Sequence, residues 1–334
     1  MSILSTQTPL RISYLGGGSD FLSFNQENEG NVLGCTFDWY VYTHFLPIPP
    51  IASENYRLTY RKTESVMNYE EFEHPVVREV MKYMDWNIPI NIATLSDVPG
   101  RTGLGSSSSF TVGLIQGLFD CIGKSLAVEE LAEIAIQIER VYLNEPGGQQ
   151  DQCHAAFGGF RKYRFSENRI EPSPLILDEE NLAEFSKCNL LVWTAQPRIN
   201  SQVSERHQNR LMSADGVQLA KELSNLAASA YEMILQEPNW ENTLSTISSK
   251  LEINWQIKLE LGEIKTNSKF EYLSEIAKSC GIRAKKILGS GDSGFCLFLG
   301  EPEQILLLKK LLDKEFTYSP MLNSEGSSLH GKMK

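Results

Sequence analysis

The chain has 334 residues, of which 41% are hydrophobic and 22% are charged, and its formal net charge at pH 7 is −11. This length and composition are ordinary for a globular enzyme of about two domains. The negative charge argues against broad binding of nucleic acids or anionic membranes. The sequence contains no run of about 18 apolar residues, so no transmembrane helix is expected.

Alternating and apolar patterns predict strands and two helices over the first half of the chain. The expected strands cover 9–15, 31–46, about 57–61, 91–95 and 160–165, and the expected helices cover about 107–121 and 128–143. The sequence Gly16-Gly17-Gly18-Ser19-Asp20 predicts a turn or tight loop after the first strand. Pro146-Gly147-Gly148 is a normal stop signal for the second helix.

The pattern changes near residue 188, where longer helical stretches begin. A strand at 189–193 precedes helices near 213–236, 240–261 and 268–279, strands at 285–288 and 295–299, and a last helix at about 303–314. The sequence contains neither an internal repeat nor a low-complexity linker. We therefore predict two α+β lobes, residues 1–184 and 185–334.

The most informative segment is Pro99-Gly100-Arg101-Thr102-Gly103-Leu104-Gly105-Ser106-Ser107-Ser108-Ser109. Its glycines and serines come directly before a helical apolar pattern. Glycines allow a close backbone approach, and the unpaired N–H groups and positive dipole at a helix start favour an anion. Serine hydroxyls can add hydrogen bonds or ligate a metal that the phosphate carries. The segment therefore predicts a phosphate-binding loop.

Two common nucleotide motifs match only in part. Gly100 and Gly105 have P-loop spacing, but Ser106-Ser107 stands where the Lys-Ser/Thr pair belongs, so a P-loop is rejected. Gly289-Ser290-Gly291-Asp292-Ser293-Gly294 fits GxGxxG, but a dinucleotide fingerprint opens into a helix and the residues that follow are strand-like. A Rossmann site is rejected as well.

Three motifs in one order carry a resemblance that spans essentially the whole chain. They are Pro9-Leu10-Arg11-Ile12-Ser13-Tyr14-Leu15-Gly16-Gly17-Gly18-Ser19-Asp20, Gly103-Leu104-Gly105-Ser106-Ser107-Ser108 and Leu288-Gly289-Ser290-Gly291-Asp292-Ser293-Gly294. In this order they resemble the GHMP small-molecule kinase superfamily, which includes galactokinase, homoserine kinase and mevalonate kinase. The glycine-rich first motif and the segment 150–159 look most like D-glycero-D-manno-heptose 7-phosphate kinases and related sugar-1-kinases. The resemblance implies an α+β fold with a ribosomal S5 domain 2-like N-terminal lobe, a ferredoxin-like C-terminal lobe and an active site between them.

The same resemblance assigns the donor side of the site. The middle motif, Gly103, Leu104, Gly105, Ser106, Ser107 and Ser108, would hold the phosphates of ATP. Ser107 and Glu139 match the Mg²⁺ ligands of the superfamily. Without the resemblance, Ser107 could be a simple helix N-cap and Glu139 a solvated helix residue.

Two residues match the catalytic positions of the family. Asp151 matches the aspartate that accepts a proton from the attacking sugar hydroxyl or orients it, and the sequence leaves both roles open. Arg11 matches a basic residue beside that aspartate, where a cation keeps the carboxylate ionised and stabilises developing charge. The plain alternatives are a loop aspartate closing an Asx-turn and a surface arginine on a strand.

The acceptor side is less determined by the sequence. Asp20 matches a residue that binds sugar hydroxyls, and Gly17, Gly18, Gly291 and Asp292 are expected close to the substrate. Asp292 departs from the glycine pattern of the third motif, and its carboxylate would repel a phosphate on the acceptor. Candidates for binding such a phosphate are Arg198 first, and then Arg101 and Lys162, whereas His154 and His207 are interpreted as structural.

The resemblance implies an Mg²⁺-dependent transfer of phosphate from ATP to a sugar hydroxyl. The expected acceptor is the anomeric hydroxyl of D-glycero-D-manno-heptose 7-phosphate; the alternatives are an unphosphorylated sugar such as L-fucose, or a non-catalytic sensor of sugar or nucleotide. The anomer and the nucleotide preference stay open. The partners are then small molecules rather than nucleic acid or membrane, and the chain is expected to be a monomer or a homodimer.

The N-terminal sequence and the cysteines indicate the compartment. The start of the chain has no basic region and no long apolar core of a signal peptide, and the six cysteines have no CxxC or Cys/His spacing. We therefore expect a cytoplasmic protein with reduced thiols and without a zinc site.

Overall fold

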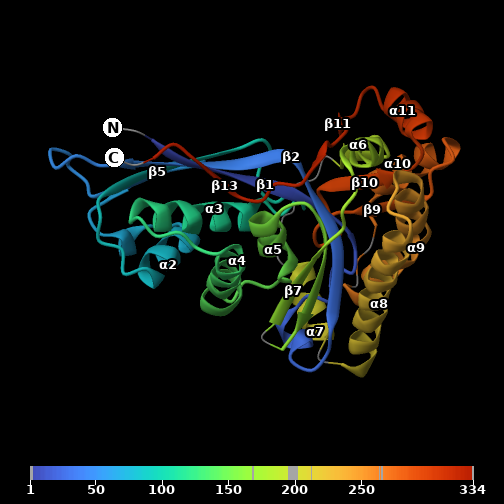
Figure 1. Cartoon of the computed structure of the whole chain (residues 1–334), viewed down its shortest axis with the longest axis horizontal. Coiled ribbons are helices and arrows are strands. Elements are labelled where there is room, and N and C mark those ends of the chain that lie inside the picture. The colour runs from blue at the N-terminus through green and yellow to red at the C-terminus, as the bar shows by residue number, and fades with distance from the viewer. Residues whose placement is uncertain are drawn as a thin grey trace.

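A computed structural model of the chain describes residues 3–167, 169–194, 202–211, 213–262, 264 and 266–332. Its first part is built around a long sheet with helices on one face, and its second part around a smaller sheet beside two long helices, α8 and α9 (Figure 1). Among the described residues, no helix is long and apolar enough to cross a membrane.

The first sheet has the order β13-β1-β2-β5-β3-β4, and β6 and β12 also pair with β2. Its strands are β1 (Leu4–Leu15), β2 (Gly30–Pro47), β3 (Tyr56–Thr59), β4 (Thr63–Val66), β5 (Ile90–Ser96), β6 (Phe160–Ser166), β7 (Arg169–Pro174), β12 (Leu322–Asn323) and β13 (Ser328–His330). The long strand β2 pairs with β5 along its second half and with β6 along its first half. The end of β5 and the start of β6 therefore lie along the same edge of β2, and the middle of β1 lies along its other edge.

Helices cover one face of this sheet (Figure 1). They are α2 (Pro75–Tyr83), α3 (Ser106–Cys121), α4 (Val128–Ile136) and α5 (Gln150–Phe157), with the short α1 (Leu22–Asn25) and a 3-10 turn at Tyr69–Glu71. Helix α3 lies against β1 and β2, and a Cβ atom at Gly117 would come within 2.1 Å of the Phe45 ring. The absence of a side chain at Gly117 lets the helix approach the sheet closely enough to fix its N-terminus over the cavity described below.

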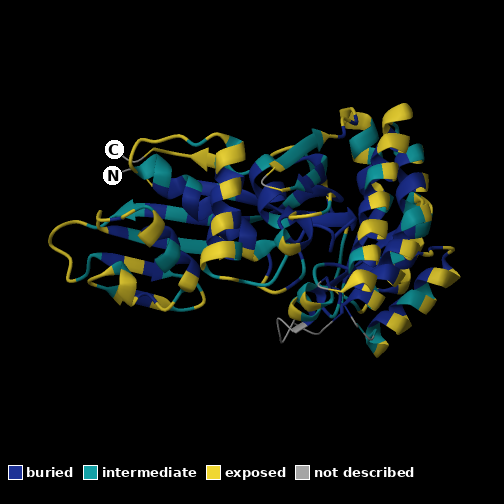
Figure 2. Ribbon diagram, turned by 90° about the horizontal axis from the view of Figure 1, so that it is seen from below, coloured by how far each residue is buried: buried dark blue, intermediate teal, exposed yellow. Residues whose placement is uncertain are grey.

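The second sheet is antiparallel and has the order β11-β8-β10-β9. Its strands are β8 (Asn189–Trp193), β9 (Ala284–Ile287), β10 (Phe295–Leu299) and β11 (Thr317–Tyr318). The accompanying helices are α6 (Glu179–Lys187), α7 (Gln202–Arg210), α8 (Ala214–Gln236), α9 (Trp240–Leu261), α10 (Ser268–Ser279) and α11 (Pro302–Leu311). All five residues of β10 are buried, and exposed residues follow the outer faces of the helices (Figure 2).

Most of the expected strands and helices are confirmed with small shifts of their ends. The expected helix at 128–143 is α-helical only to Ile136 and continues as a π-helical segment, Gln137–Tyr142. The sequence did not predict the short helices α1, α2, α5, α6 and α7, or the strands β4, β7, β11, β12 and β13. Strands β12 and β13 return to the first sheet, and the division into residues 1–184 and 185–334 stays a prediction.

Candidate active site

The glycine- and serine-rich loop follows β5 and leads directly into α3. Gly103 and Gly105 have φ values of +84° and +81°, and Gly105 is the N-cap residue of the helix. A Cβ atom at Gly103 would lie 2.6 Å from the Leu288 carbonyl oxygen, so this loop packs backbone to backbone against the third motif. Ser106, Ser107 and Ser108, the first residues of α3, line a cavity at this point, so an anion in the cavity would lie at the start of the helix.

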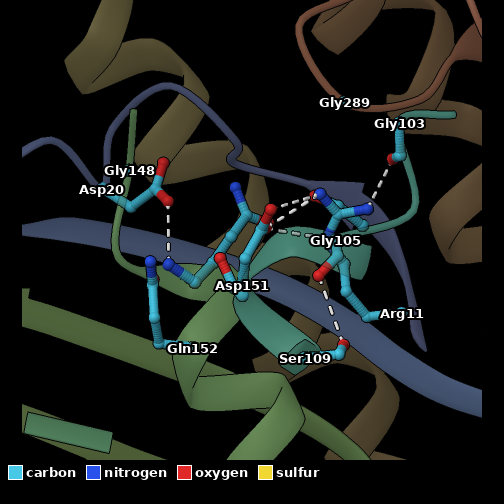
Figure 3. A network of polar contacts seen from close by, with 12 residues as sticks. Arg11, Asp20, Gly103, Gly105, Ser109, Gly148, Asp151, Gln152 and Gly289 are labelled. Atoms are coloured by element: carbon cyan, nitrogen blue, oxygen red, sulfur yellow. Dashed lines mark hydrogen bonds and ion pairs between the residues drawn. The ribbon is translucent and has the colours of Figure 1, made fainter. Parts of the chain in front are cut away.

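Arg11 and Asp151 form a bidentate ion pair beside this loop (Figure 3). Arg11 lies on β1 and is 4% exposed, and its Nε and Nη2 atoms each donate to an Asp151 carboxylate oxygen at 2.8 Å. The Nη1 atom donates to the Gly103 carbonyl oxygen at 2.6 Å. One guanidinium therefore connects the phosphate-binding loop to the carboxylate of helix α5.

The ion pair also determines the protonation state of Asp151. Burial raises the pKa of this carboxyl, but the charge and hydrogen bonds of Arg11 outweigh burial and hold the pKa below its ordinary value of 3.8. Asp151 is therefore ionised at neutral pH. It lies in the first turn of α5, and its side chain keeps 24% exposure toward the cavity.

Asp20 joins two loops on the other side of Asp151 (Figure 3). Its Oδ1 atom accepts from the Gly18 N–H at 2.9 Å, and its Oδ2 atom accepts from the Gln150 N–H at 3.1 Å. A Cβ atom at Gly148 would lie 1.9 Å from Oδ2. Asp20 is 1% exposed, and it holds the Gly16–Gly18 loop and the start of α5 at fixed positions around the cavity.

Glu139 is a buried carboxylate at the π-helical segment, and four side chains surround it. Its oxygens accept from Ser108 Oγ at 2.9 Å, Thr111 Oγ1 at 2.5 Å and Gln152 Nε2 at 2.5 Å, and Arg140 Nη2 lies 3.3 Å away. Ser107, the other predicted Mg²⁺ ligand, is the residue before Ser108. Both Ser107 and Glu139 line the cavity.

A magnesium ion fits this donor set. Mg²⁺ takes oxygen ligands and is usually bound through one or two carboxylates together with the phosphates of its substrate. Glu139 would provide one carboxylate and Ser107 a hydroxyl, and both residues line the cavity. In the part of the chain that the structure describes, no group of three or more His, Cys, Asp or Glu residues could hold a metal ion, so the substrate phosphates would complete this site.

One cavity of 220 Å³ collects most of the residues predicted from the sequence. It is lined by Arg11, Gly17, Gly18, Asp20, Gly103, Gly105, Ser106, Ser107, Ser108, Glu139 and Asp151. Leu104 lies in the core, where its carbonyl oxygen accepts from the Arg11 N–H. Of the third motif, Gly289 and Ser290 line the cavity, whereas Gly291 and Asp292 do not.

The candidates for binding an acceptor phosphate have different positions. Arg198 lies outside the described residues. Arg101 is exposed at the edge of the cavity. Lys162 lies on β6 with its Nζ 4.5 Å from the centre of the Tyr231 ring, and it does not line the cavity.

The sequence predicted no binding role for three further cavity residues. Arg140, His207 and Lys258 all line it. His207 was interpreted as structural, and Lys258 belongs to a long helix with no local motif. Arg140 lies in the π-helical segment, whereas the positions of His207 and Lys258 depend on how α7 packs against α8 and α9 against β1, which no short pattern reveals.

A second hollow adjoins the cavity at the start of α3. It has a volume of 610 Å³ and shares Arg101, Ser106 and Ser107 with the first cavity. Its other lining residues include the rings of Tyr60, His74 and Phe110. An aromatic hollow beside the phosphate-binding loop is suited to the base of a nucleotide.

The chain is similar to known kinases. The model of the GHMP kinases N terminal domain matches residues 73–159, which include the phosphate-binding loop, Glu139 and Asp151. A D-glycero-alpha-D-manno-heptose 7-phosphate kinase of Campylobacter jejuni is 28% identical, and the match covers 95% of each chain. A bifunctional fucokinase/GDP-fucose pyrophosphorylase of Arabidopsis thaliana is 23% identical, and the match covers 88% of this chain but 30% of that longer protein.

Solved structures share the whole fold. A D-glycero-D-manno-heptose 1-phosphate kinase from Bacteroides thetaiotaomicron superposes with a TM-score of 0.77 at 21% identity, with 99% of each chain covered. Lactococcus lactis galactokinase in complex with galactose gives a TM-score of 0.72 at 15% identity, with 98% of this chain and 95% of that chain covered. The two-lobed α+β fold expected from the sequence is therefore confirmed.

Proposed function

We propose that the acceptor of this enzyme is a sugar phosphate. The chain belongs to the GHMP kinases and is therefore a phosphotransferase that acts on an alcohol group. In this proposal the enzyme transfers the γ-phosphoryl group of ATP to the anomeric hydroxyl of D-glycero-D-manno-heptose 7-phosphate. The product is the 1,7-bisphosphate, and no covalent enzyme intermediate forms.

The ion pair between Arg11 and Asp151 is the observation that carries this proposal. It lies between the phosphate-binding loop, where Arg11 contacts Gly103, and the loop that Asp20 anchors. An acceptor hydroxyl at Asp151 would therefore face a phosphate held at the start of α3. Phosphoryl transfer depends mainly on such positioning and on charge stabilisation.

Each residue then has a definite task. The ionised Asp151 orients the attacking hydroxyl and accepts its proton, while Arg11 keeps Asp151 ionised and stabilises the charge on the transferred group. The N–H groups of Ser106 and Ser107 hold the phosphates, and the second hollow takes the base of the nucleotide. Mg²⁺, when held by Glu139 and Ser107 together with the phosphates, would neutralise phosphate charge.

The choice of a phosphorylated heptose is supported by the Campylobacter jejuni relative and by the position of Asp292. Asp292 does not line the cavity, and its Oδ1 atom accepts from Ser290 Oγ at 2.5 Å. The carboxylate that would have repelled a phosphate is thus turned toward its own loop. The Arabidopsis thaliana relative, which is named a fucokinase, supports L-fucose as the second candidate.

An ADP-release assay over a panel of sugars tests the proposal. We expect the highest kcat/KM with D-glycero-D-manno-heptose 7-phosphate and lower values with the unphosphorylated heptose and with L-fucose. Equal turnover of the unphosphorylated heptose would contradict a sugar-phosphate acceptor. A preference for L-fucose would replace it with the second candidate.

A further inference from the structure

Helices α7 and α9 form one wall of the cavity, and the proposed reaction assigns no role to the residues of this wall. Lys258 on α9 and His207 on α7 both line it, and their side chains are 5% and 3% exposed. Lysine is almost never fully buried unless it is paired, and here it is buried at a cavity that also holds the reacting groups. We propose that Lys258 and His207 bind the phosphate group that the sugar acceptor carries.

His207 has an unused polar atom at this wall. Within the described ranges, no donor or acceptor is in hydrogen-bond distance of its Nε2 atom. The ring packs against Phe21 at 5.6 Å between centroids, and a Cβ atom at Gly18 would lie 3.2 Å from Nε2. A buried nitrogen without a partner is unfavourable, and a polar group of a ligand in the cavity would satisfy it.

Lys258 supplies the charge. Its Nζ atom donates to the Gly289 carbonyl oxygen at 2.5 Å, which places the ammonium at the third motif. Lys286, which donates from β9 to the Ser13 and Tyr14 carbonyl oxygens at 3.0 Å, lies close behind. Burial, followed by the charges of Lys258 and Arg11, lowers the pKa of Lys286 well below its ordinary value of 10.5. The positive charges of Lys258 and Arg11 are therefore both felt at this wall of the cavity, and positive charge there favours an anion.

Five other charged side chains of the cavity are less suited to this phosphate. Asp20 and Asp151 are carboxylates, which suit hydroxyl groups and repel a phosphate. Arg11 is bonded to Asp151, and Arg140 to the Gly148 carbonyl oxygen beside Glu139. Arg101 lines both the cavity and the second hollow, which places it on the nucleotide side.

The inference rests on the proposed function, because it gives the sugar phosphate its binding site. It is tested with Lys258→Met by comparing kcat/KM for D-glycero-D-manno-heptose 7-phosphate with kcat/KM for the unphosphorylated heptose. We expect the ratio of the two values to fall roughly 30-fold or more, because a buried charged hydrogen bond is lost. Lys258→Arg should restore part of the ratio, and Lys269→Met, a lysine paired with Glu315 outside the cavity, should leave it unchanged.

The inference is overturned if the ratio changes by less than about threefold, or if the loss appears in the KM for ATP instead. It is also overturned if Lys162→Met, rather than Lys258→Met, lowers the ratio. If Lys258→Met does not fold, His207→Gln is used in the same comparison; a fall of roughly tenfold supports the inference, and an unchanged ratio contradicts it.

Failure of the proposed function gives a different result. If the wild-type enzyme does not phosphorylate the heptose 7-phosphate, the proposed function is wrong whatever the variants do. Calorimetric titration of the nucleotide-free protein with the same sugar phosphate then tests the subsite alone. Binding that is weaker by roughly 30-fold in Lys258→Met supports it, and equal or absent binding in both proteins contradicts it.

Discussion

At the scale of single residues, Asp151 is the group whose chemistry the proposal needs most. Substituting it with Asn keeps the shape but removes the charge and the ability to accept a proton. We expect Asp151→Asn to lower kcat by about 10²–10⁴-fold, the range for loss of a general base, with a small change in the KM for ATP. Steady-state kinetics with ATP and the heptose 7-phosphate measure both values.

Two controls accompany this variant. Asp215→Asn changes an aspartate that pairs with Arg210 outside the cavity, and it should keep wild-type kcat. Circular dichroism shows whether Asp151→Asn is folded. Wild-type kcat in a folded Asp151→Asn protein would remove Asp151 from the reaction.

His154 makes stability depend on pH. It lies three residues after Asp151 in α5, and burial, followed by the charge of Arg11, lowers its pKa from 6.5 to about 3. The folded protein thus keeps this ring neutral, whereas the unfolded chain takes up a proton below pH 6.5. The free energy of unfolding should therefore fall as the pH falls from about 6.5 toward 3, by up to about 1.4 kcal/mol per pH unit for this group.

Substitution by Leu tests this dependence. His154→Leu removes the titrating ring but keeps an apolar side chain of similar volume against Tyr163. Urea unfolding at a series of pH values gives the free energy of unfolding as a function of pH. Between about pH 6.5 and 3, its slope should be lower in His154→Leu than in the wild type by up to about 1.4 kcal/mol per pH unit. Equal slopes for the two proteins would mean that His154 is not buried in its neutral form.

At the scale of structural elements, the approach of Gly148 to Asp20 is a tight fit. A methyl group at residue 148 would lie 1.9 Å from Asp20 Oδ2 and would displace the carboxylate from the Gly18 and Gln150 N–H groups. We expect Gly148→Ala to raise the KM for the sugar roughly tenfold or more, because a charged hydrogen-bond network is disturbed. The KM for ATP should change less, since its loop lies on the other side of Asp151.

Gly100→Ala is the matched control. A Cβ atom at residue 100 meets nothing within 4 Å, so this variant should keep the wild-type KM for the sugar. An unchanged KM for the sugar in Gly148→Ala would show that Asp20 is not held in the way described here.

The sequence predicts elements and motifs better than it predicts the cavity wall. Arg11, the glycine- and serine-rich loop, Glu139 and Asp151 match positions of the family that the sequence resembles, so they could be named from the sequence, and their roles stay predictions. Helix α5 was not expected, because the short segment at 150–157 follows two glycines and shows no long apolar period. Lys258 and His207 reach the cavity only through tertiary packing of α9 and α7, and no local pattern contains that information.

Glu139 shows a second limit of local reasoning. The expected helix at 128–143 has a regular apolar face, but the structure changes to π-helical geometry at Gln137. Segments of this kind are frequent at functional sites. Here the change accompanies a carboxylate that accepts from Ser108, Thr111 and Gln152, which lie on two other helices.

At the scale of the whole molecule, the end of the described chain ties the two sheets together. Strand β11 pairs with β8 in the second sheet, whereas β12 and β13 pair with β2 and β1 in the first. A chain that ends at residue 316 should lose at least about 3 kcal/mol of unfolding free energy, because the burial of Leu322 alone is worth about 1.5–3 kcal/mol. Thermal unfolding followed by circular dichroism measures this loss.

A chain that ends at residue 331 is the control. It retains β11, β12 and β13 and should unfold at nearly the wild-type temperature. A chain ending at residue 316 with the same unfolding temperature would mean that these strands do not hold the two sheets together.

The identity of the product tests the central claim most directly. The wild-type enzyme is incubated with ATP, Mg²⁺ and D-glycero-D-manno-heptose 7-phosphate, and the mixture is followed by ³¹P NMR. The account predicts a new phosphate resonance coupled to the anomeric proton, which grows together with ADP while the 7-phosphate resonance persists. Release of ADP without an anomeric phosphate, or phosphate on another hydroxyl, would contradict it.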